Sequence, residues 1–350
     1  MLGPRAVLAA VLLVLLFVTS ADGVRPAPTP VPGPPVNGPL TIVSLGDSSV
    51  SGEGAGDYDP GTDGTGGDWC HRSAVAEIHE THVPGVVRTV NLACSGANSA
   101  QVGSGGTPHY TERSQTARLA ALAKHDRVVA VVVSVGANDD PQFAQILNSC
   151  VQAWADQGSC SAGFESQWQQ RIDAMAPKVV RALTDIRTAM AAVHYAPNTY
   201  QLVLQSYAAP IGPDAASGLL GLAGCPFRPV DLSWVRTTAV RALDDGLRKA
   251  ADQAHTRFLD LAEAGLGHEA CSGGNDKSTE WFTRLTVAWQ DITDNQRVGH
   301  ALQESFHPNA RGNAAFGNCL AQFLATTDRA ASCLPGTNGV LHPAQIITAG

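Results

Sequence analysis

The sequence predicts a three-layer α/β/α fold built around a mainly parallel β-sheet. Apolar, β-branched runs alternate along the chain with segments whose apolar residues recur at helical spacing. The run Val128–Val135 is apolar without alternation, as expected of a parallel strand that is buried on both faces. Three predicted strands end in turns rich in Gly, Ser, Asn and Asp. Such turns are typical of the sheet edge where open α/β folds place their functional sites.

The predicted strands are short runs of four to eight residues, which turn-forming residues then interrupt. The first ends abruptly at Gly46-Asp47-Ser48, the second at a turn that contains Gly96, and the third at Gly136-Ala137-Asn138-Asp139. In chain order the strands are Leu40–Leu45, Val87–Leu92, Val128–Val135, Tyr200–Gln205 and Phe258–Leu261.

Longer segments between these strands show the apolar spacing of amphipathic helices. The longest carries apolar residues every three or four positions from Trp168 to Met190, and we expect a kink at Pro177 because proline removes a helical hydrogen bond. The predicted helices are Ser114–His125, Phe164–His194, Trp234–His255 and Asn309–Ala325.

The N-terminus has the features of an export signal. Arg5 precedes an unbroken apolar run from Ala6 to Val18, and the small residues Thr19–Ala21 follow as a cleavage site. A retained membrane anchor is the alternative, but this run is shorter than the roughly 20 residues that span a bilayer. We therefore expect a signal peptide over residues 1–21, a secreted protein and no stable membrane span.

The remaining chain divides by composition. Residues 22–39 are rich in proline and small residues, so we expect an extended linker. One folded domain is predicted over residues 40–335, followed by a C-terminal tail over 336–350. The formal net charge of −8 argues against nucleic acid as a partner. We expect a monomer.

Eight cysteines in an exported chain predict disulfides, although buried free thiols are the alternative. Local separation along the chain favours Cys70–Cys94, Cys150–Cys160, Cys225–Cys271 and Cys319–Cys333 among the many formal connectivities. No Cys or His residues stand at zinc spacing, and the acidic loop Ser51–Trp69 lacks a full set of EF-hand ligands. We therefore expect no metal and no cofactor.

Polar residues in the strand-end turns and near the C-terminus could together hydrolyse an ester. Ser48 is the candidate nucleophile, and His307 is the candidate base that takes its proton. The tetrahedral intermediate carries an oxyanion that needs hydrogen-bond donors already in position. The Ser48 N–H, the Gly96 N–H and the Asn138 side-chain amide are candidates for that oxyanion hole.

These residues lie in four short blocks, which in chain order are Gly46-Asp47-Ser48, Gly96, Gly136-Ala137-Asn138-Asp139 and His307-Pro308. In this order the blocks resemble the signature blocks of the SGNH (GDSL-type) hydrolases. Their flanks, including Cys70-His71-Arg72-Ser73 and Glu304-Ser305-Phe306-His307-Pro308-Asn309, resemble the secreted actinobacterial esterases and lipases of that family. The resemblance implies the flavodoxin-like SGNH-hydrolase fold, a serine hydrolase activity and three of the four disulfides. Cys319–Cys333 would be an addition to that pattern.

The sequence departs from the family before the histidine. Many members carry Asp three residues before it, whereas this chain has Glu304, which we take as the acid of a triad. The alternative is a backbone carbonyl near Glu304 or Ser305 that orients His307, as in some secreted relatives, which leaves a Ser–His dyad.

The function predicted from these residues is a serine esterase or lipase that acts on acyl or lipid esters through an acyl-enzyme on Ser48. A carbohydrate esterase that deacetylates polysaccharide is the alternative, and a silent binding protein on the same fold is a further one. The aromatic residues Trp69, Trp281 and Tyr207 could face a substrate, but we expect them in the core.

Overall fold

The computed structural model describes residues 33–346, except residues 221–222, 293–294 and 296. The expected signal peptide and the first part of the expected linker lie outside the described residues. Within those residues, no helix combines the length and the hydrophobicity that a membrane crossing requires.

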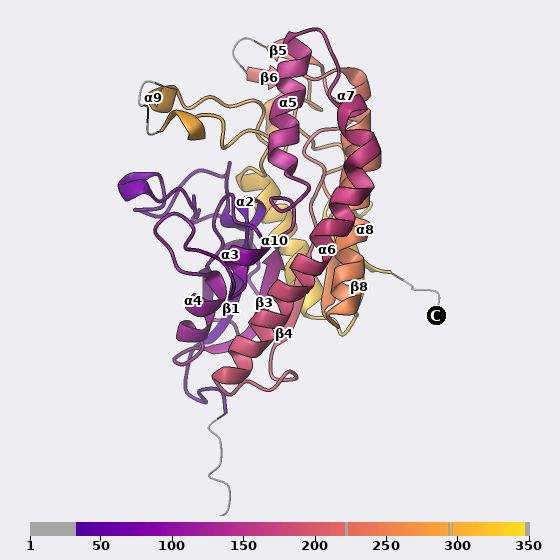
Figure 1. Ribbon diagram of the computed structural model, residues 1–350. Coiled ribbons are helices and arrows are strands. Elements are labelled where there is room, and N and C mark those ends of the chain that lie inside the picture. The colour runs from indigo at the N-terminus through magenta and orange to yellow at the C-terminus, as the bar shows by residue number, and fades with distance from the viewer. Residues whose placement is uncertain (1–32, 221–222, 293–294, 296, 347–350) are drawn as a thin grey trace, which may run out of the picture. The chain divides into compact units, whose positions relative to one another are not determined.

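A seven-stranded sheet forms the centre of the fold, in the order β2-β1-β3-β4-β7-β8-β9 (Figure 1). Every neighbouring pair is parallel except β8 and β9. The order reverses at β1, and ligands of such sheets bind beside this switch point at the carboxyl ends of the strands. The strands are β1 Leu40–Gly46, β2 Arg88–Asn91, β3 Arg127–Ser134, β4 Gln201–Gln205, β7 Arg257–Asp260, β8 Ala330–Pro335 and β9 Leu341–Gln345.

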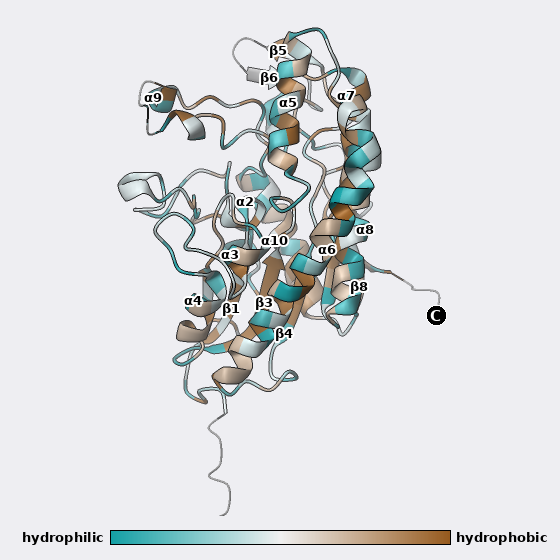
Figure 2. Cartoon of the chain, in the orientation of Figure 1, coloured by the Kyte–Doolittle hydropathy of each residue, from teal (hydrophilic) through white to brown (hydrophobic). Residues whose placement is uncertain are grey.

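Helices cover both faces of this sheet, which confirms the predicted three-layer fold (Figure 1). One layer contains α3 (Ser99–Val102), α4 (Gln115–Leu122), α6 (Ser161–Ala192) and α8 (Arg241–Gln253), which contact one another. The other contains α10 (Ala310–Leu324) and the 3-10 helix η2 (Glu77–Glu80). Hydrophobic residues are concentrated on the strands between them (Figure 2). The mostly buried β3 agrees with the continuous apolar run of its sequence.

Several elements differ from the sequence predictions. The helix predicted over Phe164–His194 is α6, which contains Pro177, and the kink expected there stays a prediction. The segment predicted as one helix over Trp234–His255 is divided into a π-helical segment η3 (Val235–Val240) and α8, and the short helix α7 (Pro229–Trp234) precedes it. The prediction also overlooked α3 and η2, named above, and the remaining elements, which are α2 (Ser48–Ser51), α5 (Phe143–Ala155), α9 (Trp289–Ile292), the hairpin β5 (Gly218–Leu220) and β6 (Ala223–Cys225), the 3-10 helices η1 (Thr65–Gly67), η4 (Lys277–Thr279) and η5 (Val298–His300), and β8 and β9.

The segment expected to be a C-terminal tail contributes the edge strand β9. Its Pro343 and its few apolar residues concealed it, because proline is tolerated in sheets only at edges or bulges. The strand pairs with β8, so the sheet extends past residue 335 to Gln345.

All four expected disulfides are present. Cys319–Cys333 joins α10 to β8, so it fastens the strand next to the edge of the sheet to the helix layer. Cys150–Cys160 joins α5 to the residue that precedes α6, and Cys225–Cys271 joins β6 to the segment after β7. No free cysteine remains among the described residues.

Reduction of these bridges is expected to lower the melting temperature by at least about 10 °C, because each native disulfide contributes roughly 2–5 kcal/mol to stability. The measurement is a thermal melt of the reduced and alkylated protein beside protein treated with alkylating agent alone. Equal melting temperatures would show that the bridges do not stabilise the fold.

Candidate active site

The candidate nucleophile stands where β1 ends and α2 begins. Gly46 has a φ of +140°, and a Cβ at this position would lie 2.0 Å from the carbonyl oxygen of Ser134 on β3, so only glycine fits. The Asp47 side chain accepts a hydrogen bond from the Ser49 N–H at 3.1 Å and so caps α2. This turn presents Ser48, partly buried, at the carboxyl edge of the sheet.

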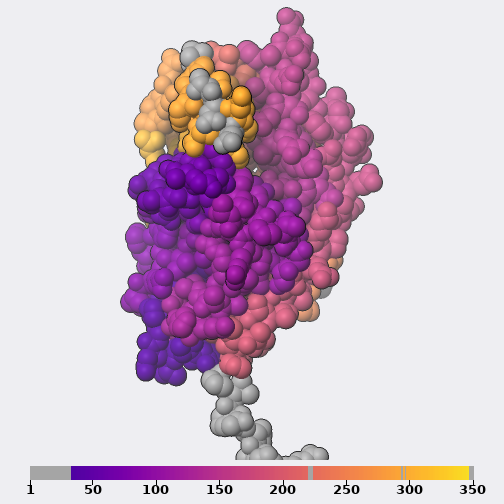
Figure 3. All heavy atoms as spheres, turned by 60° about the vertical axis from the view of Figure 1, so that its left-hand side comes forward, coloured from indigo at the N-terminus to yellow at the C-terminus, as the bar shows by residue number. Residues whose placement is uncertain are grey.

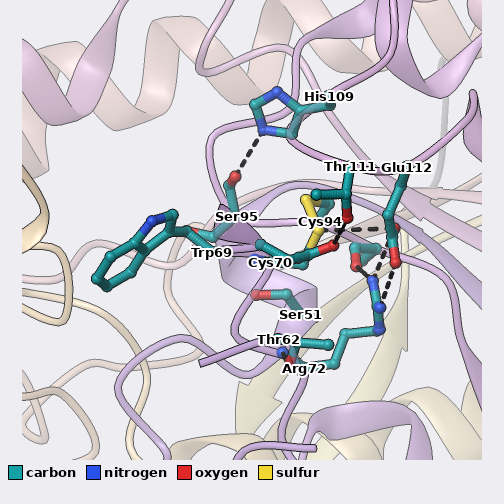
Figure 4. Close-up of a disulfide and its surroundings, with 12 residues drawn as sticks. Ser51, Thr62, Trp69, Cys70, Arg72, Cys94, Ser95, His109, Thr111 and Glu112 are labelled. Atoms are coloured by element: carbon teal, nitrogen blue, oxygen red, sulfur yellow. Dashed lines mark hydrogen bonds and ion pairs between the residues drawn. A yellow bond between two sulfur atoms is a disulfide. The ribbon is translucent and has the colours of Figure 1, made fainter. Parts of the chain in front are cut away.

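The second turn follows β2 and carries Gly96, whose φ of +79° again favours glycine. The Cys70–Cys94 disulfide ties this turn to the loop after α2, and His109 Nε2 donates to the Ser95 carbonyl at 2.8 Å (Figure 4). In the described part of the chain, no hydrogen bond uses the Gly96 N–H as a donor. That N–H is therefore available to a ligand.

The third turn follows β3 and carries Asn138. Its side-chain amide donates one hydrogen bond to the Ala97 carbonyl at 3.1 Å, and a primary amide has a second hydrogen to offer. The neighbouring Asp139 accepts from the Ser99 N–H at 3.1 Å and from the Ser99 hydroxyl at 2.6 Å. These bonds fasten the third turn to the second.

His307 Nε2 lies 2.8 Å from Ser48 Oγ, although the two residues are 259 positions apart. His307 Nδ1 lies 3.1 Å from the Ser305 carbonyl oxygen. A carbonyl can only accept, so Nδ1 carries the proton and Nε2 presents its lone pair to the Ser48 hydroxyl. The intervening Phe306 has a φ of +62°, a conformation that costs a bulky residue about 1 kcal/mol or more and that fits the tight reversal of the chain here.

Among the described residues, the Glu304 carboxylate forms no hydrogen bond or ion pair with the His307 ring. Its carboxylate accepts a hydrogen bond from the Tyr58 hydroxyl at 2.9 Å. The Ser305 carbonyl occupies the position at Nδ1 where the sequence prediction put Glu304, so the alternative of a backbone carbonyl fits this geometry and the triad prediction does not. The signature spacing does not reveal which way a carboxylate three residues before a histidine points.

A polar cluster lies close to the base. Glu53 is fully buried, with His71 Nδ1 at 2.8 Å and the Gln303 amide at 2.7 Å. Glu53, His71 and Glu304 bring ligand-type atoms within 4.8 Å of one another, which is the spacing of a possible metal site. Each of the three is also hydrogen bonded to a protein group, Glu53 to His71 and Glu304 to Tyr58.

A cleft of about 350 Å³ brings the sequence-predicted residues together, with Ser48, Gly96, Asn138 and His307 all on its walls. Aromatic and aliphatic side chains line much of the rest, namely Phe143, Leu147, Leu261, Phe282, Phe306 and Phe316. Sequence reasoning missed the part of this wall that comes from α5, namely Phe143 and Leu147, although Phe143, Ile146, Leu147 and Cys150 follow helical spacing.

The segment that contains α9 and η5 contributes Gly299, His300, Leu302 and Gln303 to the lining of the cleft. In Figure 3 this segment, in orange, lies against the indigo loop that follows α2. Trp69 joins the two, since its ring stacks on His300 at 4.0 Å and lies under the Arg297 guanidinium at 4.4 Å. Trp69 is buried, as expected, whereas Tyr207 lines the cleft. Trp281 packs against the core and stacks on His268.

Burial lowers the pKa of the His307 imidazole below its ordinary value of 6.5, although the nearby Glu53 carboxylate and the Ser305 carbonyl oppose that shift. Activity that needs neutral His307 appears as the pH rises through this pKa. We therefore expect the acid limb of kcat/KM to have its midpoint below pH 6.5, measured with a soluble ester between about pH 4 and pH 9. A midpoint above about pH 7 would contradict this prediction and indicate a carboxylate bonded directly to the imidazole.

Comparison with known proteins places these features in context. A model of a family described as the GDSL-like lipase/acylhydrolase family matches residues 44–315. Lipase 2 of Streptomyces coelicolor is 25% identical over 279 residues, which cover 78% of this chain and 82% of that protein.

Two solved structures are similar to this chain in fold. The extracellular lipase of Streptomyces rimosus gives a TM-score of 0.55 at 21% identity, over 82% of this chain and 100% of that chain. Phospholipase A1 of Streptomyces albidoflavus gives a TM-score of 0.54 at 22% identity, over 79% and 95%.

Proposed function

The chain belongs to the GDSL-like lipase/acylhydrolase family, as its four sequence blocks predicted, and we propose its reaction from this premise. We propose that it is an exported serine esterase that hydrolyses acyl or lipid esters through an acyl-enzyme on Ser48. The observation that carries the proposal is the 2.8 Å contact between Ser48 Oγ and His307 Nε2 in a largely apolar cleft.

In the acylation step, Ser48 Oγ attacks the ester carbonyl carbon while His307 Nε2 takes the hydroxyl proton. In the resulting imidazolium, the Nδ1–H still donates its hydrogen bond to the Ser305 carbonyl oxygen, whose partial negative charge favours the positive charge of the ring. When the tetrahedral intermediate collapses, Nε2 returns the proton to the leaving alcohol and the acyl group stays on Ser48. Water then repeats the sequence as the nucleophile and releases the acid.

The negative charge on the carbonyl oxygen needs donors in both steps. The Ser48 N–H, the Gly96 N–H and the second hydrogen of the Asn138 amide are the groups to which we assign this role. They lie on three turns around one cleft, which supports the assignment. Removal of one such donor typically costs roughly 10²–10³ in kcat.

The apolar wall of the cleft favours an acyl chain over a carbohydrate. Phe143, Leu147 and Phe282 offer a hydrocarbon tail dispersion contacts, whereas a glycan needs many hydrogen-bonding groups. The names of the Streptomyces relatives, two lipases and a phospholipase A1, point to the same substrate class. Export is supported by the signal-like N-terminus and by the four disulfides, since disulfides persist in oxidising compartments.

The proposal is tested with p-nitrophenyl esters of graded acyl length and with a fluorophosphonate probe, which labels activated serines. We expect kcat/KM to peak at medium or long acyl chains, and the labelled peptide to contain Ser48. Activity confined to acetate would favour the carbohydrate deacetylase. Absence of both turnover and labelling would mean that the site is silent.

A further inference from the structure

The hydroxyl group of Tyr207 bridges two of the three turns of the active site. Tyr207 follows β4 and lines the cleft. Its hydroxyl donates to Asp47 Oδ2 at 2.5 Å in the nucleophile turn, and it accepts from the Ala137 N–H at 3.2 Å in the third turn. The phenol therefore uses both its donor and its acceptor capacity between the residues that directly precede Ser48 and Asn138.

In the nucleophile turn, Asp47 connects the Tyr207 hydroxyl to the first turn of α2. Asp47 is 1% exposed, and its other oxygen, Oδ1, accepts from the Ser49 N–H at 3.1 Å and the Ser49 hydroxyl at 2.8 Å. Burial raises the pKa of Asp47 to about 6, and the hydrogen bonds from Tyr207 and Ser49 limit that rise. The ionised carboxylate thus holds the first turn of α2 with one oxygen and Tyr207 with the other.

On the far side, the third turn is already fastened to the second through Asp139 and Ser99, and through the Asn138 amide and the Ala97 carbonyl. The first and third turns also meet through a weaker contact, in which Ser49 Oγ lies 3.3 Å from Ser134 Oγ. Tyr207 completes a chain of side-chain links that runs through all three turns.

This chain matters because the three candidate oxyanion donors come from three separate segments. Donors stabilise a developing negative charge only when they are fixed at the correct distance before the reaction. A displacement of about 1 Å can cost on the order of 100-fold in rate. Ground-state binding of the acyl chain depends instead on the apolar wall of the cleft and tolerates such a shift.

We propose that Tyr207 is a positioning residue for the oxyanion hole, which sets the Ser48 N–H and the Asn138 amide in register through Asp47 and Ala137. The proposal rests on the proposed function. It differs from the expectation that Tyr207 is a core residue, because the ring packs on the core while the hydroxyl works at the site.

The first test is Tyr207→Phe, which keeps the ring and removes the hydroxyl. With a soluble p-nitrophenyl ester we expect kcat to fall about 10- to 100-fold, while KM changes less than about threefold. The chain offers a matched control in Tyr195, whose hydroxyl accepts from the Val128 N–H at 3.1 Å and donates to the Asp126 carbonyl at 2.6 Å. This bridge lies at the amino end of β3, away from the site, so Tyr195→Phe should reduce stability and leave kcat within about twofold.

The second test separates positioning from general loosening of the fold. Asn138→Ala removes one donor outright and should reduce kcat roughly 10²–10³-fold. If Tyr207 acts by positioning that donor, adding Tyr207→Phe to Asn138→Ala should reduce kcat clearly less than it does in the native background. Full additivity of the two effects would overturn the proposal, as would an unchanged kcat in Tyr207→Phe.

If Tyr207→Phe does not fold, Asp47→Ala tests the same bridge from its other end, because it removes the oxygen that accepts from the Tyr207 hydroxyl, whereas an asparagine oxygen could still accept. We expect a loss of kcat at least as large at nearly constant KM, and a folded Asp47→Ala protein with native kcat would overturn the proposal. Failure of the proposed function is distinguishable, because it would leave the native protein inactive or its activity independent of Ser48.

Discussion

Replacement of Ser48 by alanine is expected to reduce kcat for any ester substrate by a factor on the order of 10⁵–10⁶. The substitution removes the oxygen that attacks the carbonyl, which is also the hydrogen-bond partner of His307 Nε2 at 2.8 Å. A methyl group in its place leaves the capped turn intact, because the cap comes from Asp47 and the Ser49 N–H. The melting temperature should therefore remain within about 2 °C of the native value.

The adjacent Ser49 provides the matched control for this experiment. Its hydroxyl lies against Asp47 and Ser134 rather than against the base, so Ser49→Ala should lose a local hydrogen bond and about tenfold or less in kcat. An active Ser48→Ala protein beside an inactive Ser49→Ala protein would show that Ser49, not Ser48, is the nucleophile. Native activity in both variants would show that neither serine is the nucleophile.

The fold could be predicted where apolar periodicity was strong. The β-branched run of β3 and the helical spacing of α6 each contain enough apolar residues to exclude the other period. Predictions were incomplete at β8 and β9, whose short sequences include Pro335 and Pro343 and whose pairing depends on β7 beside them. Tertiary packing, which no local pattern records, decides whether such segments become strands.

The residues of the site and their chemical roles could be predicted from the sequence, but the directions in which some of its side chains point could not. Ser48, Gly96, Asn138 and His307 follow strand ends or precede a helix, and parallel strands gather their carboxyl ends at one edge of the sheet. The direction of Glu304 was not predictable, because it depends on Tyr58, which lies 246 residues away in the chain. The same holds for the Tyr207–Asp47 contact, which spans 160 residues.

The second large effect is expected from replacing His307, and a much smaller one from replacing Glu304, because of these two residues only His307 contacts Ser48. His307→Ala should reduce kcat on the order of 10⁵-fold, since no other described base lies at Ser48 Oγ. Glu304→Gln should change kcat only a few-fold, because a glutamine oxygen can still accept from the Tyr58 hydroxyl and the Ser305 carbonyl still holds His307 Nδ1. The measurement is kcat and KM of both variants with one soluble ester at a pH where the native enzyme is fully active.

A loss of several hundredfold in kcat in Glu304→Gln would instead support a triad with Glu304 as its acid, because removal of the acid from such a triad lowers kcat about 10⁴-fold. Ser305→Ala gives the complementary control. The Ser305 hydroxyl bonds to the N–H and the carbonyl of Thr286, both at 3.0 Å, whereas the group that faces His307 is its backbone carbonyl. Ser305→Ala should therefore lose stability and retain kcat. A backbone carbonyl orients His307, and a side-chain substitution cannot remove a backbone carbonyl. Activity should therefore survive substitutions at Glu304 and Ser305 but not at His307.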